Sequence, residues 1–203
     1  MRKGELTRQH IIEKAAPVFN QLGYARASLA DLMAATGLEK GGIYRHFASK
    51  EELAGAAFDY AYRMADEVKF SSVRSTEGGL AKLEKMIGNF ATLRSPVPGG
   101  CPVYNTAVEH DNGNLSLKKR ARQAYQAWIA EIAGYVEEAK SEGSLKKSVD
   151  AEATAIFLLT SLEGALIARN LTGKKAVLGI AAVELLSYLE GKKRKRAAST
   201  YPA

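Results

Sequence analysis

Residues 40–46, Lys-Gly-Gly-Ile-Tyr-Arg-His, combine side chains that can contact DNA with glycines that add no bulk. A lysine and an arginine carry positive charge, and Tyr44 offers a hydroxyl group. Ile43 and Phe47 are four residues apart, which places both on one face of a helix and leaves the polar groups on or near the other face. A short helix with such a polar face can enter the major groove, so this stretch is predicted to read DNA.

Two kinds of DNA contact are predicted from this region. Tyr44 and His46 are expected to contact phosphates, and the alternative for both is a buried structural role. Lys50 follows the predicted helix cap Ser49, where free helix amides also attract phosphate, so it is expected to bind phosphate as well. The residues expected near base edges are Lys40, Gly41 and Arg45. Glycines allow a close backbone approach, and an arginine in the major groove favours guanine.

A second short helix is predicted just before this stretch, over residues 29–36. Ser28 is a residue type that caps helix N-termini, and Asp31 three residues later completes a pattern like a capping box. Apolar residues then repeat at helical spacing, and Gly37 falls where the helix must end, a position that favours positive φ. The region therefore reads as two short helices joined by a tight turn.

These helices resemble the helix-turn-helix of the TetR family of bacterial transcriptional repressors. The resemblance rests on the order of a small cap residue, a glycine turn, Tyr-Arg-His-Phe and Lys-Glu-Glu-Leu. The matching residues are Thr7, Ile11, Ile12, Ala15, Ala16, Phe19, Gly23, Tyr24, Ser28, Leu29 and 43–53. Ser28 stands where the family more often has threonine, and either hydroxyl can contact a phosphate. Pro17 lies inside the first helix pattern, where it removes one backbone hydrogen bond.

The resemblance covers roughly the first quarter of the chain. It implies that this part reads DNA as one half of a dimer on a palindromic operator. It also implies that the rest of the chain binds a small-molecule ligand and the second subunit.

Positive charge is concentrated at the two ends of the 203-residue chain, whose net charge is +7. Residues 1–50 hold eight basic and four acidic residues, and residues 192–203 hold five basic residues and no acidic one. The stretch between them, 51–191, has a net charge of −2. Simple solubility is the alternative reading, but the excess on the predicted DNA-binding segment favours a polyanionic partner.

Several functional classes are disfavoured by composition. A single cysteine excludes an intramolecular disulfide, which agrees with a reducing cytoplasm. No run of about eighteen apolar residues and no signal peptide is recognised, so neither a membrane span nor a membrane partner is expected. With three histidines and no HExxH, GxSxG, Walker or GxGxxG pattern, the chain is not expected to be an enzyme, and no cofactor or metal is expected.

Helical spacing of apolar residues continues through the chain and predicts an all-α fold. Besides the recognition helix, the helices are expected at about 7–22, 29–36, 49–71, 78–93, 103–111, 116–142, 151–171 and 174–190. The predicted domains are an N-terminal three-helix helix-turn-helix domain at 1–49, a helical regulatory and dimerisation domain at 50–191, and a basic disordered tail at 192–203.

The segment 99–109 contains a Gly-Cys-Pro sequence followed by Asn-Thr, and it resembles a segment of one subgroup of TetR-like repressors. On that reading Cys101, Tyr104 and Asn105 lie at the lip of a ligand pocket. The alternative is a turn followed by a helix start, with Cys101 a small buried residue. A third reading makes Cys101 a redox sensor, if a helix N-terminus favours its thiolate.

Three further residues are candidates for ligand binding. Phe90 and Trp128 lie at helical spacings that are more often found in a protein core than in a pocket. Glu163 interrupts an apolar run, and a charge at that point needs a partner such as Arg169, or a ligand.

The last two predicted helices, 151–171 and 174–190, are expected to form a dimer interface. Small residues on the first of them allow another helix to approach closely, and the second carries its own apolar stripe. Paired with their symmetry mates, they would form a four-helix interface. The small residues are Ser161, Gly164, Ala165 and Ala168, and the stripe is Ile180, Val183, Leu186 and Leu189.

These observations predict a cytoplasmic, homodimeric transcriptional repressor that a small molecule releases from a palindromic operator. The alternative is a DNA-binding regulator without a small-molecule ligand, switched through Cys101 or by a protein partner.

Overall fold

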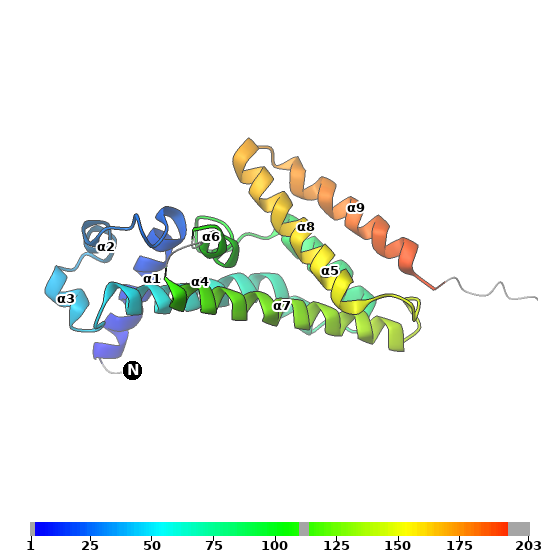
Figure 1. Ribbon diagram of the computed structural model, residues 1–203, viewed down its shortest axis with the longest axis horizontal. Helices are drawn as coiled ribbons and strands as arrows, with labels where there is room; N and C mark the ends of the chain where they lie inside the picture. Colours follow the sequence, from blue (N-terminus) through cyan, green and yellow to red (C-terminus); the bar gives the residue numbers. More distant parts are fainter. Residues whose placement is uncertain (1–2, 110–113, 195–203) are drawn as a thin grey trace, which may run out of the picture. The chain divides into compact units, whose positions relative to one another are not determined.

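The computed structural model describes residues 3–109 and 114–194, and every regular element in these ranges is an α-helix (Figure 1). The helices are α1 (Lys3–Leu22), α2 (Leu29–Thr36), α3 (Lys40–Tyr44), α4 (Lys50–Arg74), α5 (Gly79–Thr92), α6 (Pro102–Glu109), α7 (Leu115–Ser141), α8 (Ala151–Thr172) and α9 (Ala176–Lys192). The predicted all-α fold is confirmed, and most predicted boundaries lie within a few residues of the observed ones.

Local sequence signals account for several of these helix ends. Asp150 caps α8 by accepting a hydrogen bond from the amide of Ala153 at 2.9 Å. Gly37 and Gly173 end α2 and α8 with a φ of 69° each, a left-handed conformation that glycine adopts without steric cost. Pro17 lies within α1, and the helix continues through it.

The helices pack into two compact units that do not follow chain order. The first unit combines Met1–Ser71 with Leu93–Trp128, and the second combines Ser72–Thr92 with Ile129–Ala203. Helices α4 and α7 contribute to both units. Most of α4 and the segment after α5 therefore belong to the same compact unit as the helix-turn-helix. The functional division at residue 50 remains a prediction.

The first unit has a hydrophobic core that joins α1, α2, α3 and α4. Val97, which follows α5 in the chain, is also part of this core although it lies far from the helix-turn-helix in sequence. The buried core residues are Ile11, Ile12, Ala15, Ala16, Leu32, Ile43, Phe47, Leu53, Ala57, Ala61 and Val97.

In the second unit α9 packs against both α5 and α8, and α8 and α9 run side by side (Figure 1). Gly79 begins α5 so close to α7 that a Cβ there would lie 2.3 Å from the Ala139 nitrogen. The buried residues on these helices include Leu83, Met86, Ile87, Leu158, Leu159, Leu162, Leu178, Leu185 and Leu189.

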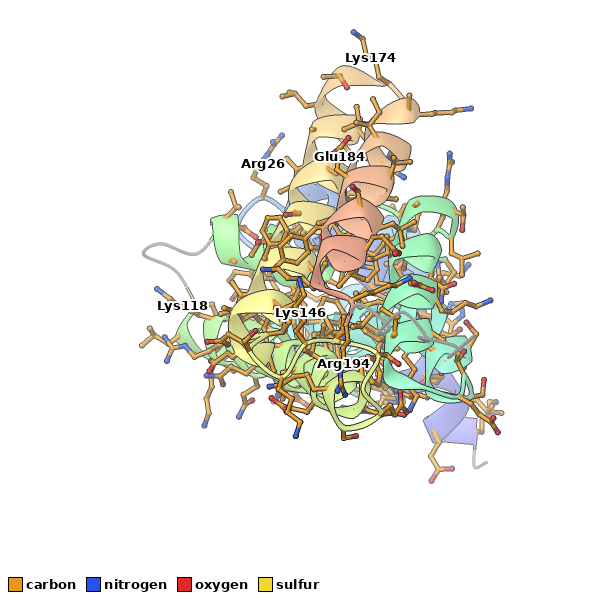
Figure 2. The ribbon with its side chains drawn as sticks, turned by 90° about the vertical axis from the view of Figure 1, so that its right-hand side faces the viewer. Arg26, Lys118, Lys146, Lys174, Glu184 and Arg194 are labelled. Carbon is orange, nitrogen blue, oxygen red and sulfur yellow. The ribbon has the colours of Figure 1, made fainter. Side chains whose placement is uncertain are left out.

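The predicted disordered tail began at Lys192, and this prediction is wrong for its first three residues. Helix α9 includes Lys192, Lys193 forms an isolated β-bridge with Leu145, and the Arg194 amide donates to the Ser144 carbonyl at 3.1 Å. Figure 2 shows Arg194 near Lys146, whose amide donates to the Lys192 carbonyl at 3.0 Å. The remaining tail residues, 195–203, lie outside the described residues.

Lys193 also holds two carboxylates at this end of α9. Its ammonium lies 2.6 Å from Glu190 and 3.4 Å from Glu84 of α5. The hydrogen bond to Glu190, followed by the contacts with Glu84, raises the pKa of Lys193 above its ordinary value. Residues 192–194, which the composition had placed in the basic tail, therefore bind the end of α9 to the rest of its unit.

Helix α8 is the one helix of the described residues that is long and apolar enough to cross a membrane, with a mean hydropathy of 1.5. The sequence had not predicted such a stretch. Within its unit α8 packs against α5 and α9 and buries Leu158, Leu159 and Leu162. Of its apolar window 39% is buried, so α8 has one face in the core of its unit and another face that the unit leaves exposed.

Candidate nucleic-acid interface

Helix α3 presents the predicted polar face. Ile43 and Phe47 are each 1% exposed and anchor the segment in the core of the first unit. Tyr44 is exposed, which excludes the buried alternative for its side chain, and His46 is half-buried. Helix α3 ends at Tyr44, so Arg45 and His46 lie just beyond its last helical residue. The other exposed residues of this face are Lys40, Gly41 and Arg45.

The two glycines of α3 have different surroundings. A Cβ added at Gly42 would lie 3.4 Å from the Cβ of Leu38, which is ordinary contact within the protein. A Cβ added at Gly41 would meet nothing within 4 Å. The fold itself therefore does not require a glycine at position 41, and the surface there is open to a partner.

Ser28 and Asp31 form a complete capping box at the start of α2. The Ser28 hydroxyl accepts from the Asp31 amide at 3.1 Å and donates to the Asp31 carboxylate at 2.6 Å. The Asp31 carboxylate also accepts from the Ser28 amide at 2.8 Å. The Ser28 hydroxyl, followed by its amide, lowers the pKa of Asp31. Because the hydroxyl hydrogen is used in the cap, Ser28 must turn away from Asp31 to donate to a phosphate.

Lys50, at the start of α4, is held by the turn between α1 and α2. Its ammonium donates to the Tyr24 carbonyl at 2.6 Å and lies 4.6 Å from the centre of the Tyr24 ring. An ammonium has three N–H donors, so two remain for a phosphate. The structure thus fixes where the Lys50 charge lies.

The start of α4 has one half of the predicted Ser-x-x-Glu capping box, because the Ser49 cap forms but Glu52 reaches back to Ala48 rather than to the Ser49 amide. Ser49 accepts from the Glu52 amide at 3.1 Å, and the Glu52 carboxylate accepts from the Ala48 amide at 2.7 Å. Arg8 lies 3.6 Å from Glu52 and stacks over the Phe47 ring at 4.6 Å. These contacts join α1 to the segment between α3 and α4 and so orient the polar face of α3.

The predicted pocket residues of the segment 99–109 belong to the first unit and lie beside α1. The Asn105 side-chain amide donates to the carbonyl and side-chain oxygens of Asn20, at 3.1 and 3.0 Å, and to the Gly99 carbonyl at 2.9 Å. Cys101 is 5% exposed, and the Tyr104 ring meets the Tyr125 ring edge-on at 6.4 Å. Asn105 therefore has a structural role as a brace of this loop, whatever else it contacts.

The other predicted pocket residues are divided between the two units. Trp128 is fully buried in the first unit, where its indole N–H donates to Asp66 at 2.9 Å. Phe90 and Glu163 are buried in the second unit. Arg169, the expected partner of Glu163, donates instead to the side chain of its neighbour Asn170. The six predicted ligand residues thus do not form one site within either unit.

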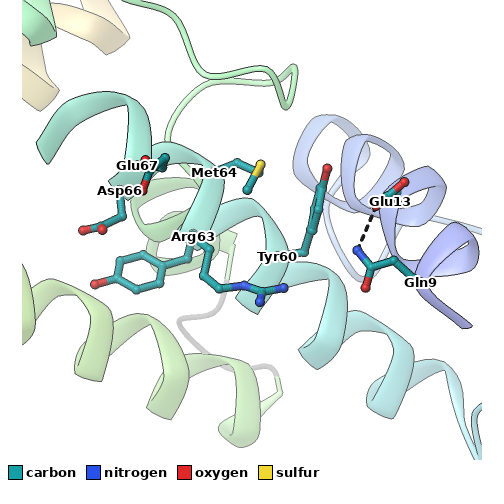
Figure 3. Close-up of a pocket in the computed structure, with 8 residues that line it drawn as sticks. Gln9, Glu13, Tyr60, Arg63, Met64, Asp66 and Glu67 are labelled. Atoms are coloured by element: carbon teal, nitrogen blue, oxygen red, sulfur yellow. Dashed lines mark hydrogen bonds between the residues drawn. The ribbon is translucent and has the colours of Figure 1, made fainter. Parts of the chain in front are cut away.

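Two clefts of the first unit are lined by other residues. One, of about 630 Å³, lies between α1 and α4 (Figure 3), and Gln9 there donates to Glu13 at 2.8 Å. Its other lining residues are Tyr60, Tyr62, Arg63, Met64, Asp66 and Glu67. A second cleft, of about 230 Å³, lies between α4 and α7 and is lined by Phe58, Asp59, Tyr62, Arg120, Gln123, Ala124 and Ala127. The sequence patterns pointed to neither cleft.

The sequence patterns also missed two residues that shape the DNA-binding region. Glu109 accepts hydrogen bonds from the amides of Tyr24 and Ala25, and Asn20 donates to the carbonyls of Pro98 and Gly100. Each contact joins residues about eighty positions apart in the chain. No periodicity or capping pattern connects positions so far apart, so the sequence held no signal for them.

Comparisons with known proteins agree with the helix-turn-helix geometry. A family model described as "Bacterial regulatory proteins, tetR family" matches residues 11–57, and one described as "Tetracyclin repressor-like, C-terminal domain" matches residues 79–184. The transcriptional repressor DhaR of Mycobacterium sp. strain GP1 is 26% identical over 161 residues, which cover 79% of this chain and 80% of that protein.

Solved structures match over nearly the whole chain. A TetR transcriptional regulator from Chloroflexus aurantiacus is 37% identical, with a TM-score of 0.90, and the match covers 96% of this chain and 99% of the other. A regulator from Saccharomonospora viridis, solved in complex with choline, has the same fold, with a TM-score of 0.79 at 20% identity. That match covers 95% of this chain and all of the other.

Proposed function

Since the chain belongs to the TetR family of DNA-binding transcriptional regulators, we propose that it is a homodimeric repressor that a small molecule releases from its operator. The relatives that carry this family assignment are regulators rather than enzymes, and the function rests on binding rather than catalysis.

The observation that carries the DNA-binding role is the two-sided character of α3. Ile43 of α3 and Phe47 just beyond its end are buried, while Lys40, Gly41 and Tyr44 of α3 are exposed. In the proposed complex Lys40, Gly41 and Arg45 lie near base edges, and Ser28, Tyr44, His46 and Lys50 hold the phosphate backbone. Base contacts then give specificity, and phosphate contacts give orientation and most of the salt dependence.

Dimerisation through α8 and α9 is supported by apolar side chains that their own unit leaves exposed. Residues 156, 160, 164, 167 and 171 follow one another at helical spacing along α8, and Gly164 in the middle has nothing within 4 Å of an added Cβ. The exposed apolar residues of the two helices are Ile156, Phe157, Ile167, Leu171, Ile180, Val183 and Leu186. Such an exposed apolar stripe is typical of a surface that a partner covers. Leu189, predicted for the same stripe, is buried within its own unit.

Release by a small molecule is supported by the complex of the Saccharomonospora viridis regulator with choline, a protein of the same fold. In the proposed mechanism, two recognition helices about 34–36 Å apart match successive major grooves of a palindrome. A ligand bound by residues 50–191 favours a second state in which α4 has moved, and by linkage that state binds the operator more weakly.

The decisive experiment selects binding sites from a pool of random-sequence duplexes with the full-length protein. We expect a palindromic site whose half-sites are about one helical turn apart, bound by one dimer. Tyr44→Phe should weaken binding to this site and to a scrambled duplex by similar factors, because a phosphate contact carries no sequence information. Failure to enrich any site, or enrichment of a single half-site bound by one subunit, would overturn the proposal.

A further inference from the structure

The turn between α1 and α2 is held by a residue from outside the helix-turn-helix. The Glu109 carboxylate, at the end of α6, accepts from the Tyr24 amide at 2.8 Å with one oxygen and from the Ala25 amide at 2.7 Å with the other. Both hydrogen bonds are charge-assisted, which makes them stronger than bonds between neutral groups. Gly23, with a φ of 80°, leaves room for this carboxylate, because a Cβ there would lie 2.7 Å from it.

The same turn is held on its other side by Lys50. One peptide group, between Tyr24 and Ala25, donates its N–H to Glu109 and accepts from the Lys50 ammonium at 2.6 Å with its carbonyl. A carboxylate and an ammonium are thus joined through a single peptide group. Hydrogen bonds in such a chain polarise one another, so each bond is weakened when the other is lost.

The segment that carries Glu109 is itself attached to α1. Val97 is buried in the core around α1, and Asn20 donates to the carbonyls of Pro98 at 2.7 Å and Gly100 at 3.2 Å. At Gly99 a Cβ would lie 2.7 Å from the Asn20 carbonyl oxygen, so this loop follows α1 closely. The end of α6 is therefore positioned against the same helix that leads into the turn.

We propose that Glu109 is a positioning residue for DNA binding, which fixes the Lys50 ammonium through the peptide group between Tyr24 and Ala25. The DNA-binding part of the chain then extends beyond the helix-turn-helix to include residues 97–109. This inference rests on the proposed function, because it assigns Lys50 to a phosphate of the operator.

Because Glu109 is negatively charged, a positioning role and a simple charge effect predict opposite changes in DNA affinity. Removing a negative charge from the DNA-binding unit should by Coulomb attraction alone strengthen binding to a polyanion. Positioning predicts the opposite result, because in Glu109→Gln one of the two acceptor oxygens becomes an NH2 group, which cannot accept from the backbone amide that it faces. We expect Glu109→Gln to weaken operator binding about tenfold and to lower the slope of log affinity against log salt by about one unit per subunit, as the loss of a phosphate contact does.

The test uses the full-length protein and the duplex that the wild type selects from random sequence. The matched control is Glu67→Gln, which removes the same charge from an exposed residue of α4 in the same unit and should leave affinity unchanged or slightly higher. A second arm repeats Glu109→Gln in a Lys50→Met background, where its effect on affinity should largely disappear because both changes remove the same contact. Thermal melting of each variant shows that binding is measured on folded protein.

Each outcome bears on the inference. Unchanged or stronger binding by Glu109→Gln, or an effect of the same size in the Lys50→Met background, would overturn it. If Glu109→Gln does not fold, Glu109→Asp retains the charge but is one methylene shorter, and wild-type affinity in that variant would also overturn the inference. Failure of the wild type to select any duplex would overturn the proposed function instead, so the two failures are distinguishable.

Discussion

Gly41 lies on the outer face of α3, where an added methyl group would meet no atom of the protein within 4 Å. Gly134 and Gly164 have the same open space, so what distinguishes Gly41 is its position on the face that is proposed to approach DNA. Ile43, two positions later in the same five-residue helix, is buried. One side of α3 therefore stabilises the fold, and the opposite side can read DNA.

Gly41→Ala should therefore reduce operator affinity without reducing the stability of the fold. Alanine favours a helix over glycine by roughly 0.5–1 kcal/mol, so the variant should be slightly more stable than the wild type. Operator affinity should fall at least tenfold, as measured by fluorescence anisotropy, because the methyl group occupies space that DNA needs. Gly134→Ala is the matched control, an exposed glycine within α7 with equal space, and it should bind normally. Normal binding by Gly41→Ala would contradict the close approach.

Cys101 allows a prediction about redox control. Its side chain is 5% exposed, and a buried thiol reacts slowly with peroxide. We expect mild peroxide to leave the operator affinity of the wild type and of Cys101→Ser unchanged. A reversible loss of affinity in the wild type alone would instead identify Cys101 as the switch.

Helix ends that are capped by residues nearby in the sequence lie where the sequence patterns predicted them. Ser28 and Asp31, three positions apart, form the complete predicted box, and Ser49 caps α4 through the Glu52 amide, although the Glu52 carboxylate accepts from Ala48 instead of Ser49. The end of α9 differed from its pattern. Its basic residues read as a disordered run because their partners, Leu145 and Glu84, lie far away in the chain.

Ser28→Ala should cost about 1 kcal/mol of folding stability, the usual effect of removing a helix cap. It should also change the response to acid. Ser28 holds the pKa of Asp31 below its ordinary value of 3.8, so the ionised carboxylate stabilises the fold above that pH, and this contribution is lost as the pH falls through the lowered pKa. Chemical unfolding between pH 6 and pH 3 should show a smaller acid loss in Ser28→Ala, whereas Ser28→Thr should behave as the wild type.

Two truncations test the end of α9. A chain that ends after Arg194 keeps the bridge to Leu145 and the contacts of Lys193, and it should melt at the wild-type temperature. A chain that ends after Gly191 loses the backbone hydrogen bonds to Lys146, Ser144 and Glu190 together with the ion pairs of Lys193, and it should be less stable by roughly 1–3 kcal/mol. Equal melting temperatures of the two truncated chains would show that these contacts contribute nothing to stability.

The chain that ends after Arg194 also tests whether residues 195–203 contact DNA. Its non-specific DNA affinity at low salt is compared with that of the full-length protein.

At the scale of the whole molecule, each compact unit is assembled from two separated stretches of the chain. The unit that holds the helix-turn-helix also holds residues 93–128, and the unit that holds α8 and α9 also holds α5. Assembly is expected through surfaces that a unit leaves exposed, and more than half of the exposed large apolar side chains in the described part of the chain lie on α8 and α9.

Leu171→Glu tests the proposed dimer interface on α8. Leu171 is 85% exposed, so a glutamate there costs little within the subunit, but it would place a charge in the apolar contact between subunits. We expect the variant to shift toward monomer in light scattering and to lose operator affinity. The matched control is Leu115→Glu on α7, an equally apolar residue that is 81% exposed, which should remain dimeric. A dimer of unchanged stability in Leu171→Glu would place the interface elsewhere.

Local spacing was enough to predict most of the helices, the capping box at Ser28 and the apolar and polar sides of residues 40–47, because these features depend on residues within about one helical turn of each other. Ile43 and Phe47 are buried and Tyr44 is exposed as that spacing predicted. Contacts between residues far apart in the chain became visible only in the folded protein. The tertiary structure placed Glu109 on the turn at Tyr24, buried Trp128 against Asp66, and joined Lys193 to Glu84. Such contacts depend on the path of the whole chain, and the local spacing of residues does not encode that path.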